Sequence, residues 1–299
     1  MLTFSIDYLS FTIFNVEIQT IIDHLPKCDF QFMEKGRLGY KKAIMYKGVR
    51  ILYDGNEEMG IHVDASSSAL AWATDILYIP TIQGNVKFTR IDIACDILDD
   101  DFYNIISIHT LNHNFKTKRR KRSEIKSYNT SSNQIVGRTI YFGSRTSSVF
   151  MRIYDKALEK KEDKDWTRME LEIKSKTAHN LAKMINEYPL DKLFFLILNN
   201  YIDFIDRSAS KNISRCPRLD FWNNFITTDK SVTIAPKKED KNISKTYNWL
   251  LKQVSKSLAK IDKVDTQGNL NLVDGLIQIG NHKISAEDEM QIEEFLKDI

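Results

Sequence analysis

Residues 147–156, SSVFMRIYDK, and residues 166–174, WTRMELEIK, decide the expected fold, because both alternate polar and apolar side chains with a period of two. That period is typical of strands with one buried face and one open face. The charged segment between the two stretches is long enough to let them pair antiparallel. Such a pairing would place Tyr154 beside Glu170 or Glu172 on the polar face.

Outward from these stretches, the same patterns predict further strands and then a run of helices. The expected strands cover residues 2–14, 40–53, 59–65, 87–98 and 137–143, with a hairpin turn at Asp54-Gly55. Helices are expected after Asn15, from Ser66 to about Leu77, and over residues 101–111, 176–187, 190–205, 218–227 and 244–262. A short hairpin over residues 270–279 and an acidic helix that begins at Ser285 complete the chain.

The expected fold class is therefore α+β: a mainly antiparallel central sheet with flanking helices, followed by a smaller, mostly helical C-terminal region. Residues 1–175 would form the sheet domain, residues 176–230 a helical extension packed on it, and residues 243–299 the C-terminal region. The polar segment 231–242, which contains Pro236, is the predicted linker.

The composition is that of an ordered protein, with 42% hydrophobic residues, 28% charged residues and only 5 prolines in 299 residues. The net charge of +3 hides a segregation, because residues 116–126 carry seven basic side chains and one acid, whereas residues 285–299 carry six acids and one lysine. The three cysteines lack the spacing of a disulfide framework or a zinc site. Without a signal sequence or a membrane-length apolar run, we expect a soluble, cytoplasmic protein with no membrane partner.

Carboxylates recur on one face of two predicted strands. In the stretch TRIDIACD, the side chains of Arg90, Asp92 and Asp96 share a face, and Glu170 and Glu172 repeat the arrangement on the later strand. Carboxylate oxygens at such positions suit a divalent cation. The alternative is a pair of ordinary strands with one solvent-exposed face and no metal.

Tyr154 is flanked on its own strand face by Arg152 and Lys156. Positive potential from these side chains would favour phenolate over phenol and would attract phosphate. A tyrosine is a poor nucleophile until it is activated, so this setting is a candidate for tyrosine chemistry. The alternative is a surface tyrosine with basic neighbours. Arg145, in the Gly- and Ser-containing turn before this strand, would add a phosphate contact.

Two basic stretches are candidates for contact with nucleic acid. The segment KTKRRKRSEIK has three interpretations: a tract like a nuclear-localisation signal, a solvated loop, or a clamp on a nucleic-acid backbone. Its central cations are Lys118, Arg119, Arg120, Lys121 and Arg122. The lysine-rich helix expected near residues 244–263 is either an ordinary amphipathic helix or a contact with a duplex. His62 and Asp64 share a strand face and would either complete a metal site or be structural.

Three stretches, in this order and spacing, carry a resemblance to a known family: TRIDIACD, TIYFGSRTSSVFMRIYDKALEKK and WTRMELEIK. The stretches IDYLSFTI, MGIHVDAS and PRLDFWNNF extend the resemblance over most of residues 3–228. Together they resemble the Rep_trans-type replication initiation factor family of rolling-circle plasmids, which also includes relaxases of integrative conjugative elements. The chain departs from that pattern at SSALAW, residues 67–72, and beyond residue 228.

The resemblance implies a replication initiator that nicks one strand of supercoiled origin DNA at a single-stranded site. The tyrosine that matches is Tyr154, which would attack the strand, stay joined to the 5′-phosphate and leave a 3′-hydroxyl that primes synthesis. The required Mg or Mn ion would be held by carboxylates among Asp92, Asp96, Glu170 and Glu172.

The resemblance also implies a homodimer that works with a host helicase. Residues 1–175 would then be the nicking and strand-transfer domain, and residues 243–299 would act in DNA specificity or dimerisation. Arg152 and Lys156 would assist catalysis, and the DNA-binding residues would be Arg90, Lys118, Arg119, Arg120, Lys121, Arg122, Arg145 and Arg168. Two other functions stay open: a relaxase that uses the same chemistry for conjugative transfer, and a non-catalytic DNA-binding regulator of this fold.

Overall fold

A computed structural model of the chain describes residues 1–25, 27, 29–56, 58–73, 76, 85–98, 101–185, 187–227, 230–232, 234 and 243–297. The chain divides into two units, Met1–Pro236 (unit 1) and Lys237–Ile299 (unit 2), and each is described by itself. The boundary between them falls inside the predicted linker, 231–242. Unit 1 holds both the predicted sheet domain and the helices that follow it.

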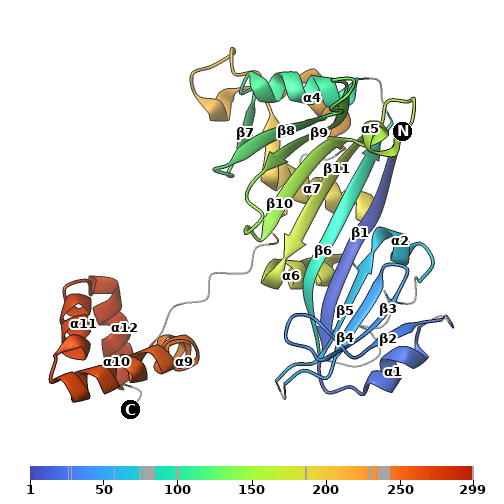
Figure 1. Ribbon diagram of the computed structural model, residues 1–299. Helices are drawn as coiled ribbons and strands as arrows, with labels where there is room; N and C mark the ends of the chain where they lie inside the picture. Colours follow the sequence, from blue (N-terminus) through green and yellow to red (C-terminus); the bar gives the residue numbers. More distant parts are fainter. Residues whose placement is uncertain are drawn as a thin grey trace. The chain divides into compact units, whose positions relative to one another are not determined.

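The main element of unit 1 is an antiparallel sheet of ten strands (Figure 1). Its strand order is β2-β3-β4-β5-β1-β6-β11-β10-β9-β8. The bounds are β1 (Leu2–Ile13), β2 (Gln31–Met33), β3 (Lys42–Tyr46), β4 (Val49–Tyr53), β5 (Ile61–Ser66), β6 (Val86–Ile97), β8 (Arg122–Tyr128), β9 (Ile135–Phe142), β10 (Val149–Asp155) and β11 (Thr167–Lys174). The predicted α+β class with a mainly antiparallel sheet is confirmed.

The alternation seen in the sequence gives this sheet one apolar face and one polar face. Phe11, Ile93 and Leu171 are fully buried on the apolar face, and burial of each such side chain stabilises the fold by roughly 1.5–3 kcal/mol. The helices α6 (Ser175–Ile185) and α7 (Leu190–Tyr201) pack on that face behind β1, β6 and β11 (Figure 1). The polar face is thereby left for charged side chains.

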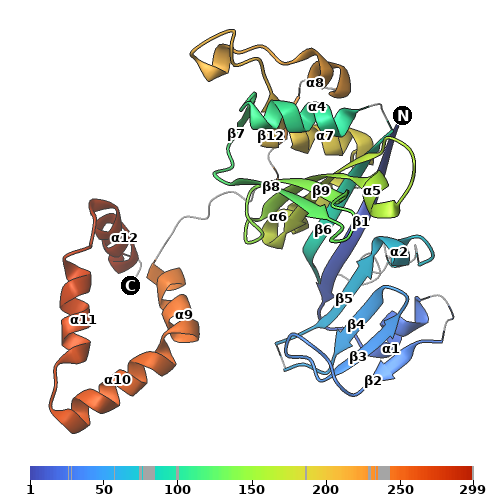
Figure 2. The same ribbon diagram turned by 45° about the horizontal axis from the view of Figure 1, so that its top comes forward.

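Shorter elements complete unit 1. They are α1 (Ile18–Asp23), α2 (Ser67–Leu70), α4 (Phe102–Leu111), α5 (Lys156–Lys160), α8 (Asp220–Phe225), the 3-10 helix Ile213–Arg215, and a two-stranded sheet of β7 (Phe115–Thr117) and β12 (Ile202–Phe204). Aromatic rings join α4, α7 and α8, which lie together in Figure 2. The ring of Phe225 lies 5.0 Å from that of Phe102 and 5.3 Å from that of Phe195.

The structure corrects several predicted elements of unit 1. Residues 40–53 form two strands instead of one, because Lys47 and Gly48 have positive φ angles of 36° and 90° and turn the chain between β3 and β4. The strands β2, β7, β8 and β12 were not predicted, and β12 shows that strands do not stop at residue 174. The helix predicted from Ser66 to Leu77 ends at Leu70, and residues 74, 75 and 77 lie outside the described residues.

Unit 2 is helical in its described part, with α9 (Ile243–Gln253), α10 (Ser255–Gly268), α11 (Leu272–Asn281) and α12 (Ala286–Lys297). The predicted hairpin over residues 270–279 is wrong, because Leu272, Leu276 and Ile279 recur at helical spacing and lie in α11. The helix predicted over residues 244–262 is two helices, α9 and α10. Ser285 caps α12 as predicted, since its hydroxyl accepts the N–H of Asp288 at 3.3 Å.

Neither unit contains, in the residues described, a helix that is long and apolar enough to cross a membrane.

Candidate active site

The polar face of the sheet gathers most of the predicted site residues on three neighbouring strands, β6, β11 and β10. The register sets Glu172 opposite Asp92 and Glu170 opposite Arg152. Side chains that face each other in this way lie about 4.5–5.5 Å apart at their Cβ atoms and interact directly. Tyr154 lies on the same face, two residues beyond Arg152 on β10.

Tyr154 is bonded to a carboxylate and to a cation at the same oxygen atom. Its hydroxyl donates a hydrogen bond to Oε1 of Glu170 at 2.5 Å, and Nζ of Lys156 donates to the hydroxyl oxygen at 3.3 Å. Lys156 begins α5, and Asp155 caps this helix by accepting the N–H of Leu158 at 3.0 Å. The cap fixes the turn that brings Nζ of Lys156 to 5.3 Å from the centre of the Tyr154 ring.

The Tyr154 hydroxyl is a neutral phenol in this setting. Burial raises its pKa well above the ordinary value of 10.0, and the charge of Glu170 and the hydrogen bond to it raise the pKa further. The expectation that basic neighbours favour the phenolate is therefore wrong. Burial also raises the pKa of Glu170, although Arg152 and the hydrogen bond from Tyr154 oppose this effect. A carboxylate with a raised pKa is a better proton acceptor.

Arg152 links Glu170 to the next carboxylate. Its guanidinium forms an ion pair with Oε2 of Glu170 and lies 3.6 Å from Oδ2 of Asp92. Its Nε atom is buried and has no hydrogen-bond partner among the residues that the structure describes. Buried donors without a partner are rare, and this N–H is an unsatisfied donor within the cluster.

Arg90 holds the two remaining carboxylates of the cluster. Its Nε donates to Oδ1 of Asp92 at 2.8 Å, and its Nη2 donates to Oε2 of Glu172 at 2.8 Å. Burial raises the pKa of Asp92 in spite of Arg90. Burial acts in the same direction on Glu172, but the hydrogen bond from Lys174 and the charge of Arg90 outweigh it and lower the pKa of Glu172.

Asp96, the fourth predicted metal ligand, lies apart from this cluster. It accepts hydrogen bonds from Nε1 of Trp166 at 2.7 Å and from Nε of Arg168 at 2.6 Å. Arg168 also donates to Asp7 on β1 at 2.8 Å. Asp96 is therefore part of a separate ion-pair group with Arg168 at its centre.

Three residues of this face, Asp7, Tyr8 and Trp166, were not singled out from the sequence. A β-bulge between Ile6 and Tyr8 lets the consecutive residues Asp7 and Tyr8 both reach the polar face. The Tyr8 ring lies 4.5 Å from the guanidinium of Arg90. Strict alternation assigns consecutive residues to opposite faces, so only the adjacent polar pair Asp7-Tyr8 within a strand could have signalled the bulge.

The carboxylate cluster matches a Mg or Mn site in chemistry but not in arrangement. Asp92, Glu170 and Glu172 offer the oxygen ligands that these ions prefer. Each of the three carboxylates already accepts a hydrogen bond or forms an ion pair with an arginine or a lysine. In the described part of the chain, no group of three or more His, Cys, Asp or Glu side chains is placed to hold a metal ion.

His62 does not join the carboxylate cluster. Its ring nitrogens lie 2.9 Å from the hydroxyl of Thr12 and 3.3 Å from the hydroxyl of Ser10, and Nε2 lies 3.3 Å from Oδ1 of Asp64. Both ring nitrogens thus have partners on β1 and β5, as expected for a structural histidine.

The predicted DNA-binding cations divide into two groups, and the first is already engaged within the protein. Arg90 and Arg168 hold carboxylates, as described above. Lys118 donates to Oδ1 of Asn200 at 3.3 Å, the guanidinium of Arg119 lies 4.5 Å from the Tyr201 ring, and Arg122 donates to the carbonyl of Thr110.

The second group is exposed. Arg120 and Lys121 lie just before β8, and Arg145 lies in the turn before β10. Their side chains have no hydrogen bond or ion pair with any other residue that the structure describes. Among the predicted DNA-binding cations, these three can bind phosphate without losing an interaction within the protein.

Comparisons with known proteins agree with this architecture. A family model described as replication initiation factor matches residues 86–277, and one described as the N-terminal domain of a rolling circle replication initiation protein matches residues 3–70. The "Putative DNA relaxase NicK" of Bacillus subtilis (strain 168) is 22% identical in an alignment of 321 positions, which covers 98% of this chain and 90% of the relative. The structure of a rolling circle replication initiator protein from Geobacillus stearothermophilus matches with a TM-score of 0.69 and 25% identity, over 80% of this chain and 100% of that chain.

The first family model spans more than half of the sequence and includes β6, β10 and β11, on which the Tyr154 cluster lies. The resemblance stated from the sequence motifs is confirmed by both family models. The chain belongs to the replication initiation factor family.

Proposed function

We propose that this protein nicks one strand of origin DNA through Tyr154 and thereby initiates rolling-circle replication. The observation that carries the proposal is the Tyr154 hydroxyl, bonded to Glu170 at 2.5 Å and to Lys156 at 3.3 Å on the polar sheet face. Family membership and the similarity to a solved rolling-circle initiator support the reaction class.

Glu170 acts as the general base in this proposal. Its carboxylate accepts the phenol proton while the Tyr154 oxygen attacks a phosphorus atom of the DNA backbone. A bond forms between the phenol oxygen and phosphorus, the bond from phosphorus to the 3′-oxygen breaks, and the 3′-oxygen takes up a proton from solvent. The 5′-phosphate stays joined to Tyr154, and the other end is a free 3′-hydroxyl.

One phosphate ester replaces another in this step, so the reaction needs no nucleotide hydrolysis. The sequence agrees with this, since it contains no GxxxxGK[ST] phosphate-binding loop. Reversal of the same step closes the strand again, with protonated Glu170 returning its proton to the phenol oxygen.

Lys156 and Arg152 supply positive charge where the transition state becomes more negative. Lys156 already contacts the attacking oxygen, and the buried Nε of Arg152 has no partner in the described part of the chain. A non-bridging phosphate oxygen would satisfy that donor. Fixed donors aimed at developing charge are usually the largest single contribution to catalysis.

A divalent cation is a separate part of the proposal. When bound, Mg or Mn would neutralise phosphate oxygens, and Asp92 and Glu172 would be the ligands, because Glu170 has to stay free to accept the phenol proton. The arginines and the lysine that hold these two carboxylates would have to give way to the ion. We expect EDTA to abolish nicking; nicking that persists in EDTA would assign the charge neutralisation to the basic side chains alone.

Exposed cations would hold the DNA on either side of the reacting phosphate. Arg120, Lys121 and Arg145 have no internal partners among the described residues, and each phosphate contact releases counterions and adds affinity. Lys256 and Lys260, exposed on α10, are candidates for the same role in unit 2.

Nicking of supercoiled DNA tests the proposal. Wild-type protein with Mg or Mn should convert a plasmid that carries the origin of its own element into open circles with covalently attached protein. Tyr154→Phe should give none. Tyr141→Phe is the matched control, because its ring stacks on Phe150 at 5.5 Å on the neighbouring strand, and it should nick like the wild type.

Two outcomes would contradict the proposal. An absence of open circles with the wild-type protein would exclude the catalytic function and favour a DNA-binding regulator. Equal nicking by Tyr154→Phe would move the nucleophile elsewhere, with Tyr141 as the next candidate.

Conjugative transfer is a second candidate use of the same chemistry. The observation that favours it is the similarity to a protein described as a DNA relaxase, which extends over 98% of this chain. Neighbouring genes distinguish the two uses: coupling and secretion genes would indicate transfer, and their absence would indicate replication.

A homodimer, a host helicase and a cytoplasmic location complete the proposal. No described residue of unit 2 is buried, and Trp249, Leu276 and Ile279 expose 58%, 51% and 56% of their surface. Apolar patches of this kind mark interaction surfaces, and a second copy would cover them. Light scattering should give twice the chain mass of 34.8 kDa; a monomer at micromolar concentration would contradict the dimer.

A further inference from the structure

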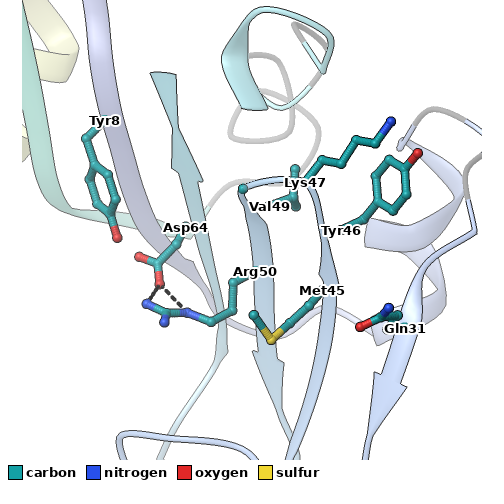
Figure 3. Close-up of a pocket in the computed structure, with 9 residues that line it drawn as sticks. Tyr8, Gln31, Met45, Tyr46, Lys47, Val49, Arg50 and Asp64 are labelled. Carbon is teal, nitrogen blue, oxygen red and sulfur yellow. Dashed lines mark hydrogen bonds and ion pairs between the residues drawn. The ribbon is translucent and has the colours of Figure 1, made fainter. Parts of the chain in front are cut away.

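A cavity of about 460 Å³ opens on the sheet in the N-terminal part of unit 1, away from Tyr154. Its volume is in the range of pockets that enclose small organic ligands. The nicking mechanism assigns no role to this part of the chain. Figure 3 shows six polar or aromatic side chains of its lining: Tyr8, Gln31, Tyr46, Lys47, Arg50 and Asp64.

The cavity lies on the same polar sheet face as the nicking site. Cross-strand partners follow one another without a break from Gln31 on β2 to Arg90 on β6, and such partners share a face. The ring of Tyr8, in the cavity wall, lies 4.5 Å from the guanidinium of Arg90. A DNA strand that follows this face from the nicking site therefore reaches the cavity.

Arg50 has a fixed orientation in one wall. Its Nε donates to Oδ2 of Asp64 at 2.9 Å, and its Nη2 donates to the same oxygen (Figure 3). Burial acts to raise the pKa of Asp64, but hydrogen bonds from His62 and Arg50 outweigh it and hold the pKa well below the usual range. A guanidinium has five N–H donors, so donors remain for a ligand.

The β3–β4 turn adds a cation to the rim of the cavity. Lys47 is exposed in this turn, and its Nζ lies 5.2 Å from the centre of the Tyr46 ring. Tyr46 directly follows Met45, which shares the face of Arg50, so the Tyr46 ring points to the other face of β3 and packs on Trp72 at 5.2 Å and Phe30 at 5.7 Å. A positive charge beside the path of the backbone is a usual means of holding single-stranded nucleic acid.

The distance to Tyr154 indicates what such a ligand does. β4 and β10 are five positions apart in the strand order, which puts Arg50 roughly 24 Å from Tyr154 across the sheet at about 4.8 Å per strand. The cavity is therefore too far from Tyr154 to touch the phosphate that is cut. A group bound there contributes to the choice of DNA sequence and not to the chemical step.

We propose that this cavity binds an unpaired base of the DNA that the protein nicks, with guanine preferred. Arg50 donates to O6 and N7 of guanine, the commonest specific contact between a side chain and a base. Lys47 holds the adjoining phosphate. The inference rests on the proposed function, because it takes DNA as the ligand, and adds to it a residue that determines sequence preference.

Fluorescence anisotropy with two labelled oligonucleotides tests this proposal. One is a single-stranded oligo(dT) of about 20 nucleotides, long enough to span a typical single-strand site, and the other differs by one central dG. We expect wild-type protein to bind the dG oligonucleotide roughly tenfold more tightly. Arg50→Lys keeps the charge but loses the planar fork, so the ratio of the two dissociation constants should fall to about 1.

Two further variants keep the test independent of folding defects at Arg50. Lys47→Ala changes an exposed side chain and should weaken binding of both oligonucleotides equally while the ratio stays. Lys211→Ala removes an exposed lysine outside the cavity lining and should change neither constant. Equal binding of both oligonucleotides by the wild type, or a ratio that survives in Arg50→Lys, would overturn the proposal.

The nicking assay shows which of the two hypotheses is wrong: that the cavity binds a base, or that the protein nicks DNA. Tyr154→Phe should keep the tenfold ratio and lose nicking. A wild-type protein that nicks but shows no preference for dG would contradict the cavity alone. A preference for dG in a protein that does not nick would contradict the catalytic function and leave the cavity assignment standing.

Discussion

Two sets of cations in unit 1 differ in what surrounds them. Arg152 and Arg168, at the centre of the polar face, form ion pairs with carboxylates of the sheet. Arg120 and Lys121, just before β8, are exposed and have no side-chain partner in the described part of the chain. The surroundings of a cation, and not its residue type, therefore decide its role. Cations paired with carboxylates hold the catalytic side chains in place, and exposed cations bind phosphate.

The largest effect is expected at the centre, from Glu170→Gln. An amide cannot accept the phenol proton, so the rate of nicking should fall by about 10²–10⁴-fold. The amide keeps a contact with the Tyr154 hydroxyl, so DNA affinity should stay the same. Single-turnover nicking with protein in excess measures the rate. A rate close to that of the wild type would show that another group removes the proton.

A second large effect is expected from Arg168→Met, in this case on stability. The change leaves the half-buried carboxylates of Asp7 and Asp96 without their shared guanidinium, and loss of a hydrogen-bond partner at such a group costs about 1–3 kcal/mol of unfolding free energy. Arg145→Met is the matched control at an exposed position and should stay within about 0.5 kcal/mol. Urea denaturation measures both, and equal losses would remove the distinction between paired and exposed cations.

The pH dependence of nicking tests whether Glu170 is the general base. The base must be ionised to accept a proton, so the rate should fall about tenfold per pH unit below the pKa of Glu170. Because burial raises that pKa above its usual 4.5, the fall should begin at a higher pH than an ordinary glutamate would give. Rate profiles of the wild type and Glu170→Gln provide the check: a fall that persists unchanged in the variant would belong to another group.

The smallest effect is expected at the exposed cations. The double variant Arg120→Ala/Lys121→Ala should weaken binding of single-stranded DNA and reduce the slope of log affinity against log salt by about 1.4, or about 0.7 for each lost phosphate contact. Its unfolding free energy should stay within about 0.5 kcal/mol of the wild type. Titrations at several salt concentrations measure the slope, and an unchanged slope would exclude these residues from the DNA path.

The centre of the site was predictable from the sequence, and its edges were not. β6, β10 and β11 follow strict alternation, which predicted their bounds to within two residues and placed Tyr154 beside Glu170 or Glu172; the structure shows that Glu170 is the partner. The direction of the Tyr154 pKa shift was not predictable, because it depends on burial by neighbouring strands rather than on neighbours along the sequence.

Short and irregular elements account for most of the other differences. β2, β7 and β12 are three residues long, too short for a period of two to be visible. The turn at Lys47-Gly48 lies inside a stretch that reads as continuous strand, and it builds one wall of the N-terminal cavity. The apolar residues of α11 begin directly after Leu270. The sequence of this segment therefore also fits two short strands, although the spacing of its apolar residues is helical.

The most direct test of the central claim is to identify the amino acid that becomes joined to DNA. Wild-type protein is incubated with supercoiled origin DNA and a divalent cation, and the covalent product is digested with nuclease and trypsin before mass spectrometry. We expect a nucleotide adduct on Tyr154, in the tryptic peptide of residues 153–156. An adduct on Tyr141, or nicked DNA without any protein adduct, would contradict it.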